Sequence, residues 1–168
     1  MNRLSRIALA ASLSLGMLSM PTMALAATDV TYALRGSEIA ATEFTGVFVG
    51  VAVATDDYGT WQATIDHDSV PTKKNKSAEV TGGSFAFDGE LRDLAGTFDP
   101  GGSITLETDV QPCGKQTYRV VGDLTLTGPT AGTADFEAVV THHRIFLWGH
   151  CITYAATVKG SVTFHLTT

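Results

Sequence analysis

Residues able to do acid–base or metal chemistry are concentrated in one stretch of the chain, from Thr133 to Tyr154. It carries three of the five histidines, one of the two cysteines, one of the two tryptophans and an arginine: His142, His143, His150, Cys151, Trp148 and Arg144. Imidazole changes its charge near neutral pH, so it can serve as an acid, a base or a metal ligand. The alternation of apolar and polar residues predicts that the stretch is a β-hairpin.

The face on which these residues lie follows from the parity of the apolar positions. Between Tyr118 and Leu166 the large apolar residues of the predicted strands are mostly even-numbered and most charged residues are odd-numbered. Because successive side chains of a strand point to opposite faces, the even-numbered ones should face the core. Near the hairpin turn this row ends in polar residues, which we expect at the mouth of a barrel. The predicted ligand-binding residues are His142, Arg144, His150, Tyr154, Trp61 and Trp148.

The turn of the hairpin determines which of these residues meet. With a turn over Ile145–Gly149, Arg144 pairs with His150, and His143 lies on the outer face opposite Cys151. The large apolar residues of this turn either fold over and plug the barrel end or stand exposed as a contact surface for a partner, a glycan or a membrane. Plugging is the commoner fate of such residues.

Three interpretations of the histidine cluster are open. In the first, the imidazoles and the guanidinium only satisfy backbone groups at a loop end. In the second, zinc or copper is held by His67, His142 and His150, the histidines expected at one height of the barrel. In the third, His142, Arg144 and Tyr154 are the hydrogen-bond donors at the mouth of a pocket, and its apolar wall is formed by Trp61, Phe48, Phe136 and Trp148. No carboxylate is predicted beside an inward histidine, which argues against triad chemistry.

Residues 1–26 have the pattern of a signal peptide. Two arginines precede an apolar run, Ile7–Leu18, that is too short to span a bilayer, and Ala24–Ala26 is a small-residue cleavage site. We therefore expect cleavage between Ala26 and Ala27. The mature chain, residues 27–168, should be a single all-β domain that is secreted or otherwise extracytoplasmic and has no transmembrane segment.

Charge and cysteine content restrict the partners. The formal net charge is −6, and loss of the leader's arginines makes it more negative. Because an acidic surface repels phosphate groups, nucleic acid and anionic membranes are poor partners. Cys113 and Cys151 have neither metal-ligand nor redox spacing, so in an exported protein they should form a disulfide with each other. No cofactor is expected.

After Ala27 the chain alternates with period two and is punctuated by glycine, which is typical of short antiparallel strands. Residues 36–43 are the exception, where a short helical turn is predicted. Residues 44–54 are expected to form a strand buried on both faces, and residues 95–98 and 103–107 a hairpin around Asp99–Gly102. We predict an all-β, single-domain antiparallel β-barrel with one disulfide, or alternatively a two-sheet β-sandwich.

These observations favour a non-catalytic binding module. Its ligand, a small amphipathic or anionic molecule or a surface glycan, is expected at the barrel mouth. A small enzyme of the lyase, isomerase or hydrolase kind using the same pocket is one alternative. A structural or surface-exposed protein without a ligand is the other.

Overall fold

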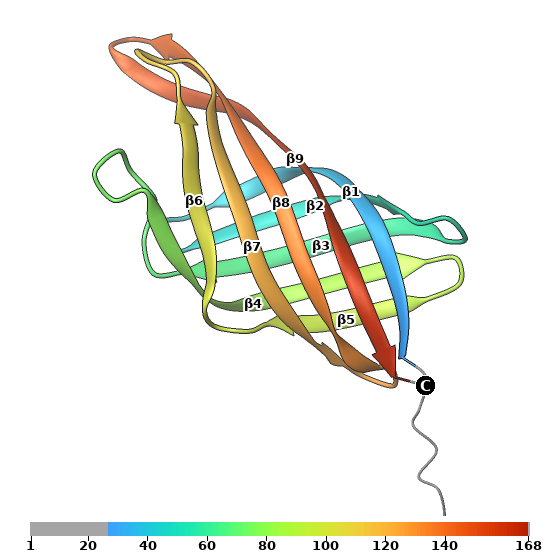
Figure 1. Ribbon diagram of the computed structural model, residues 1–168. Helices are drawn as coiled ribbons and strands as arrows, with labels where there is room; N and C mark the ends of the chain where they lie inside the picture. Colours follow the sequence, from blue (N-terminus) through green and yellow to red (C-terminus); the bar gives the residue numbers. More distant parts are fainter. Residues whose placement is uncertain (1–26, 168) are drawn as a thin grey trace, which may run out of the picture.

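The computed structural model describes residues 27–167, and the predicted signal peptide lies outside the described residues. The described part of the chain forms nine antiparallel strands (Figure 1). They are β1 (Ala27–Ala41), β2 (Thr45–Val53), β3 (Tyr58–His67), β4 (Ser77–Gly89), β5 (Asp93–Phe98), β6 (Gly102–Asp109), β7 (Gln116–Thr127), β8 (Ala131–Leu147) and β9 (His150–Thr167). Residues 27–167 contain no helix that is long and apolar enough to cross a membrane.

The strands close into a barrel with eight positions around the ring. Their order is β3-β2-β1-β9-β8-β7-β5-β4, and β4 pairs again with β3. The extra strand β6 shares the position of β5: β5 pairs with the last residues of β4 and β7, whereas β6 pairs with their first residues. The predicted antiparallel barrel is therefore confirmed, and the alternative of two packed sheets is not adopted.

Side chains fill the interior of this barrel. The even-numbered apolar residues predicted to face inward are buried in β7, in β8 and in the part of β9 that follows Ala155, as is Trp61 of β3. Aromatic rings occupy the centre, where Phe85 packs against Trp61, Phe136 and Phe164. An eight-stranded barrel is just wide enough for side chains to fill it. The centre is accordingly a packed core and not a ligand chamber.

Three details of the predicted strands are wrong. Residues 36–41, expected as a helical turn, continue β1, because β2 pairs with them as far as Ala41. Strand β2 is not buried on both faces: Phe48 points into the core, whereas Val51 and Val53 are exposed on the outer wall. The turn before β6 does not make a hairpin, because β5 and β6 pair with β4 and β7 and not with each other.

A buried polar network closes the barrel end formed by the β2–β3 and β4–β5 turns. Asp57 is 3% exposed, and its carboxylate accepts hydrogen bonds from the Tyr32 hydroxyl (2.8 Å) and the Leu91 backbone N–H (3.0 Å). Arg92 lies 3.6 Å from Asp57 and 2.8 Å from the exposed Asp56. Burial raises the pKa of Asp57, but the hydrogen bonds and Arg92 outweigh burial and hold this pKa below its ordinary value.

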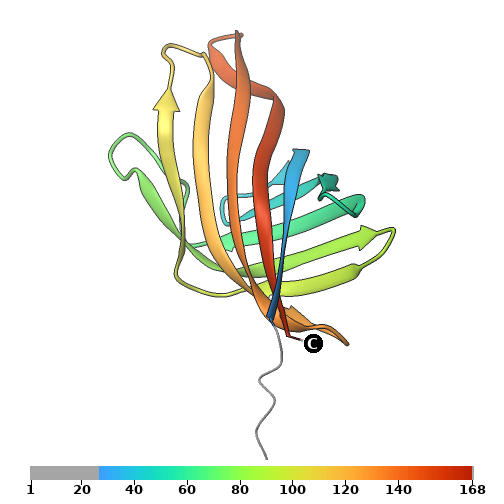
Figure 2. The same cartoon turned by 45° about the vertical axis from the view of Figure 1, so that its right-hand side comes forward.

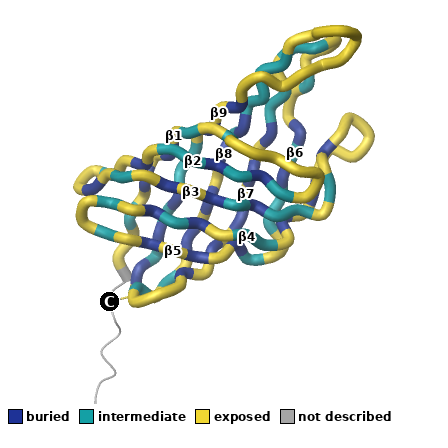
Figure 3. Tube along the Cα trace, turned by 180° about the vertical axis from the view of Figure 1, so that it is seen from behind, coloured by how far each residue is buried: buried dark blue, intermediate teal, exposed yellow. Residues whose placement is uncertain are grey.

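At the other rim, the hairpin of β8 and β9 continues beyond the barrel (Figures 1 and 2). Strand β7 pairs with β8 only as far as His142, whereas the β8–β9 ladder runs on to Leu147 and His150. We call residues 143–155 the hairpin extension. The predicted disulfide Cys113–Cys151 is present, and it joins the hairpin extension to the β6–β7 connection. Most of the extension is exposed (Figure 3).

Candidate functional site

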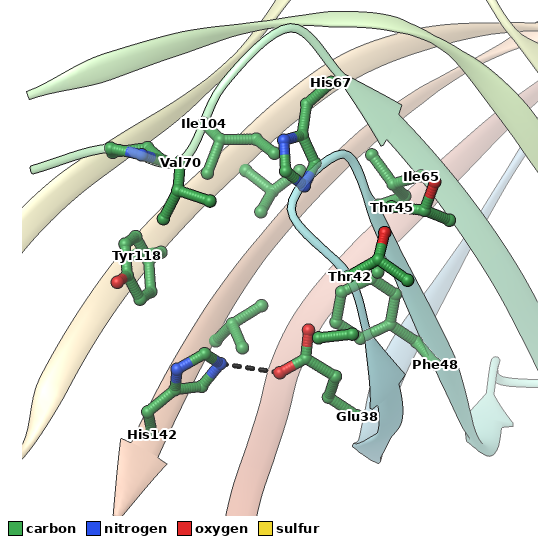
Figure 4. Close-up of a pocket in the computed structure, with 15 residues that line it drawn as sticks. Glu38, Thr42, Thr45, Phe48, Ile65, His67, Val70, Ile104, Tyr118 and His142 are labelled. Atoms are coloured by element: carbon green, nitrogen blue, oxygen red, sulfur yellow. Dashed lines mark hydrogen bonds and ion pairs between the residues drawn. The ribbon is translucent and has the colours of Figure 1, made fainter. Parts of the chain in front are cut away.

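A cavity of about 100 Å³ lies at the rim from which the hairpin extension leaves the barrel. It is bounded by strand ends and by the β3–β4 loop, residues 68–76 (Figure 4). Its walls are mostly apolar, with Phe48 and Val140 towards the core. The polar side chains of the lining are Glu38, Thr42, Thr45, His67, Tyr118 and His142.

Glu38 and His142 form a hydrogen-bonded pair in this cavity. Nε2 of His142 lies 2.6 Å from Oε2 of Glu38, and the side chains are only 20% and 12% exposed, respectively (Figure 4). Glu38 lies in β1 and His142 in β8, and both strands pair with β9. The two side chains therefore lie two strands apart in the ring, on the same inner face. An ionised carboxylate only accepts hydrogen bonds, so Nε2 of His142 is the donor of this bond.

Tyr118 of β7 lies beside this pair. Its ring is 5.2 Å from the imidazole of His142, in an edge-to-face arrangement. Burial raises the pKa of Tyr118 to about 12, so the hydroxyl is protonated at neutral pH and can donate a hydrogen bond. Within residues 27–167 no group is hydrogen-bonded to this hydroxyl, which leaves it available to a ligand or to water.

His67 and the β3–β4 loop form the opposite wall. Nδ1 of His67 lies 2.8 Å from the Ser69 carbonyl oxygen, so Nδ1 carries the hydrogen of this bond. Figure 4 shows His67 and His142 entering the cavity from opposite sides. Val70 and Pro71 of the loop complete the wall. The cavity thus has a polar ring on each of two sides of a small apolar space.

Arg144, predicted to line the mouth, binds elsewhere. Its guanidinium donates to the Gly114 carbonyl oxygen (2.9 Å) and to the Gln116 side chain (3.2 Å), and it pairs with Asp109. It therefore fastens the base of the hairpin extension to the β6–β7 connection. It is not among the residues that line the cavity.

The other predicted ligand-binding residues are also spread apart. His150, Tyr154 and Trp148 are exposed on the hairpin extension. Trp61 is buried in the core, where its Nε1 donates to backbone carbonyl oxygens of neighbouring strands. Of the six predicted ligand-binding residues only His142 lines the cavity, and of the predicted apolar wall only Phe48 does.

The hairpin turn explains this separation. The turn is Trp148–Gly149, both with positive φ, and a β-bulge between His143 and Arg144 shifts the β8–β9 register by one residue. Arg144 consequently pairs with Thr153 instead of His150, and the predicted partner of His143 is wrong as well. The apolar turn residues stand away from the barrel, so they do not plug its end.

The histidines do not converge on a metal. Among the described residues no three His, Cys, Asp or Glu side chains are grouped so that they could hold an ion. Of the predicted set, His67 and His142 line the cavity, whereas His150 lies on the hairpin extension. The three therefore share no site.

Glu38 is the residue of the candidate site that the sequence did not predict, so the expectation that no carboxylate lies beside an inward histidine is wrong. It lies in the segment predicted as a helical turn, where no face could be assigned to it. The signal was nevertheless present, because the inward parity of Tyr32 and Leu34 leads through Gly36 to Glu38 if the strand is simply continued. This extension of β1 supplies the carboxylate that orients His142.

Comparison of the chain with protein-family models, with curated proteins and with solved structures gives no match. The chemistry of the site is therefore the guide to its function. A carboxylate, an oriented imidazole and a phenol on an apolar wall can bind the polar atom of an otherwise apolar group. An imidazole oriented by a carboxylate can also accept a proton.

Proposed function

We propose that this protein is an exported, non-catalytic binding module whose barrel-end cavity takes up one compact, largely apolar group of a small ligand. The observation that carries the proposal is the Glu38–His142 pair inside an otherwise apolar cavity of a barrel whose centre is filled. Buried polar groups in such a place fix the orientation of a ligand. Export is supported by the predicted leader, and the disulfide is compatible with it.

The size and charge of the cavity define the ligand class. About 100 Å³ is less than the roughly 300 Å³ at which pockets for complete drug-sized ligands begin, so the cavity suits a ring or a short branched chain. An anionic group is disfavoured, because Glu38 places a carboxylate in the cavity and Arg144 is already paired with Asp109. We therefore expect an amphipathic ligand with an uncharged or cationic polar atom.

A substitution that fills the cavity should abolish binding. Val70 lines the cavity from an exposed loop and is 45% exposed, so Val70→Trp can occupy the space without disturbing the core. A fragment present at ten times its Kd should stabilise the wild-type protein by about 1.4 kcal/mol, or roughly 4 °C in Tm. We expect this shift in a thermal-denaturation screen of small amphipathic fragments, and its loss in the Val70→Trp variant.

Val53→Trp is the matched control, because Val53 is 53% exposed on the outer barrel wall, away from the cavity. Its fragment-induced shifts should equal those of the wild type. Shifts that persist in the Val70→Trp variant would place the binding elsewhere and contradict the proposal. A screen of several hundred fragments that gives no shift in the wild type would do the same.

A second candidate function is acid–base catalysis in the same cavity, favoured by the 2.6 Å contact that orients His142. The substitution Glu38→Gln separates the two functions, because the amide keeps a hydrogen-bond acceptor near Nε2 but removes the charge. If the site only binds, fragment affinity should change by no more than about tenfold, and mass spectrometry should find every fragment unaltered. Turnover that falls by about 10²–10⁴-fold in the variant would identify an enzyme.

A further inference from the structure

The apex of the hairpin extension is an exposed group of large apolar side chains. It consists of Ile145, Phe146, Leu147, Trp148 and Ile152, none of which is buried, and Trp148 is 89% exposed. Trp148 has φ 48°, a left-handed conformation that residues other than glycine rarely adopt. A bulky indole is thus held outward at a turn where a small residue would be less strained.

This apex is apolar on both of its faces. Ile145 lies opposite Ile152 on one face of the two-stranded ribbon, whereas Phe146 lies opposite Cys151 on the other. Trp148 extends from the end. A partner protein that docks against one face would leave the other in water, whereas a surrounding apolar medium would cover all of these side chains.

The charges around the apex fit a lipid surface. The formal net charge of the chain is −6, yet its last acidic residue is Glu137, so the hairpin extension contains no carboxylate. Asp109, in the strand that leads to the disulfide-linked connection, is paired with Arg144 and lies 3.9 Å from Lys73. The extension is therefore a neutral to weakly basic part of an acidic molecule, which can approach a bilayer without repulsion from its headgroups.

The extension is also held firmly. The Cys113–Cys151 disulfide and the hydrogen bonds of Arg144 attach it to the β6–β7 connection at two points. A rigid projection loses little conformational entropy when it binds. We propose that the hairpin extension inserts its apex into the interfacial region of a phospholipid bilayer, with Trp148 at the level of the headgroups. Tryptophan is enriched at that level because its ring is apolar and its N–H is polar.

Intrinsic fluorescence tests this proposal directly, because the chain has two tryptophans and Trp61, 2% exposed, is already shielded from water. Because the closed barrel lies within residues 27–167, the experiment can use the disulfide-bonded chain that begins at Ala27. This chain lacks the apolar run Ile7–Leu18. Phosphatidylcholine vesicles should shift the emission to shorter wavelength and sediment the protein. Both effects should persist in 0.5 M salt, roughly where charge interactions are screened.

The double substitution Phe146→Ser/Trp148→Ser should lower the vesicle partition coefficient at least about tenfold. The control is Val51→Ser/Val53→Ser, which removes two exposed valines from the outer barrel wall and should leave partitioning unchanged. An equal fall of the partition coefficient in both variants would overturn the proposal. So would a wild-type emission wavelength that vesicles leave unchanged. A blue shift that depends on protein concentration without vesicles would overturn it too, since it would identify a second copy as the occupant.

Discussion

Replacing Asp57 with alanine is expected to lower the free energy of unfolding by about 3 kcal/mol, or roughly 10 °C in Tm. Asp57 is the buried acceptor that joins the two turns at the closed end of the barrel. Without its carboxylate, the Tyr32 hydroxyl and the Leu91 backbone N–H lose their partner, and Arg92 loses one of its two counter-charges. An unpaired buried donor costs more than the hydrogen bond itself contributes.

Asp56→Ala provides the matched control for this experiment. Asp56 contacts the same guanidinium at 2.8 Å, but its side chain is 55% exposed. Exposed ion pairs contribute up to about 1 kcal/mol, so the control should have a much smaller effect. Urea unfolding of both variants gives the comparison. Equal destabilisation by the two substitutions would show that burial of Asp57 does not matter.

The effect of Asp57 should also depend on pH. Its pKa is lower in the folded protein than the roughly 3.9 of an unfolded chain. The unfolded state therefore binds the proton more readily, and ionised Asp57 stabilises the folded state above that pH. This contribution is lost as pH falls through the folded-state pKa. The stability difference between the wild type and the Asp57→Asn variant should consequently be largest near neutral pH and shrink below about pH 4.

Removal of the disulfide is expected to have the largest effect on stability, about 4 kcal/mol for a closed loop of this length. The bridged cysteines are 38 residues apart, so the bond restricts the unfolded chain considerably. The double substitution Cys113→Ser/Cys151→Ser avoids a free thiol. Because the bond lies outside the ring of strands, the barrel should still form, and its circular dichroism spectrum should match the wild type.

Hydrogen exchange separates the local effect of the disulfide from the global one. In the double variant, amides of the hairpin extension should exchange with an opening free energy below the global free energy of unfolding. The β8 amides between Thr133 and Thr141 should exchange with an opening free energy equal to the global value. Intact-mass analysis of the wild type should show a gain of about 2 Da on reduction. An unchanged unfolding free energy in the double variant would contradict the role assigned to this bond.

The even and odd positions of apolar and polar residues correctly predicted which side chains of the barrel wall face inward, because one face of each wall strand is buried in the core. In β7, β8 and the barrel part of β9, burial on one face makes a shift of one residue costly, so the apolar pattern identifies the face. The same rule failed beyond the rim. There Ile152 and Tyr154 are even-numbered but exposed, because past His143 no core remains and a β-bulge changes the register.

Local composition misled the prediction where non-local pairing decides the structure. The segment from Gly36 to Ala41 contains residues common in helices, yet pairing with β2 holds it in a strand. The turn at Asp99–Gly102 was found, but no local signal shows that β5 and β6 occupy one position in the ring. Because the segment from Gly36 to Ala41 was not predicted as a strand, His142 was assigned to the site and its partner Glu38 was not.

The site and the hairpin extension share one end of the molecule. His142 lines the cavity, and the extension begins at the next residue. If the apex inserts into a bilayer, the mouth of the cavity lies near the same surface. An amphipathic ligand would be abundant there, although binding in the cavity and docking of the apex are separate proposals with separate tests.

The most direct test of the cavity as a ligand site is ¹H–¹⁵N NMR of the histidine side chains during titration with the most strongly stabilising fragment. His142 lines the cavity and His150 lies exposed on the hairpin extension, so the two imidazoles are signal and internal control in one spectrum. The imidazole resonances of His142 should shift saturably with the Kd found by thermal denaturation, while those of His150 remain in place. Saturation of binding with no change at His142 would contradict the account.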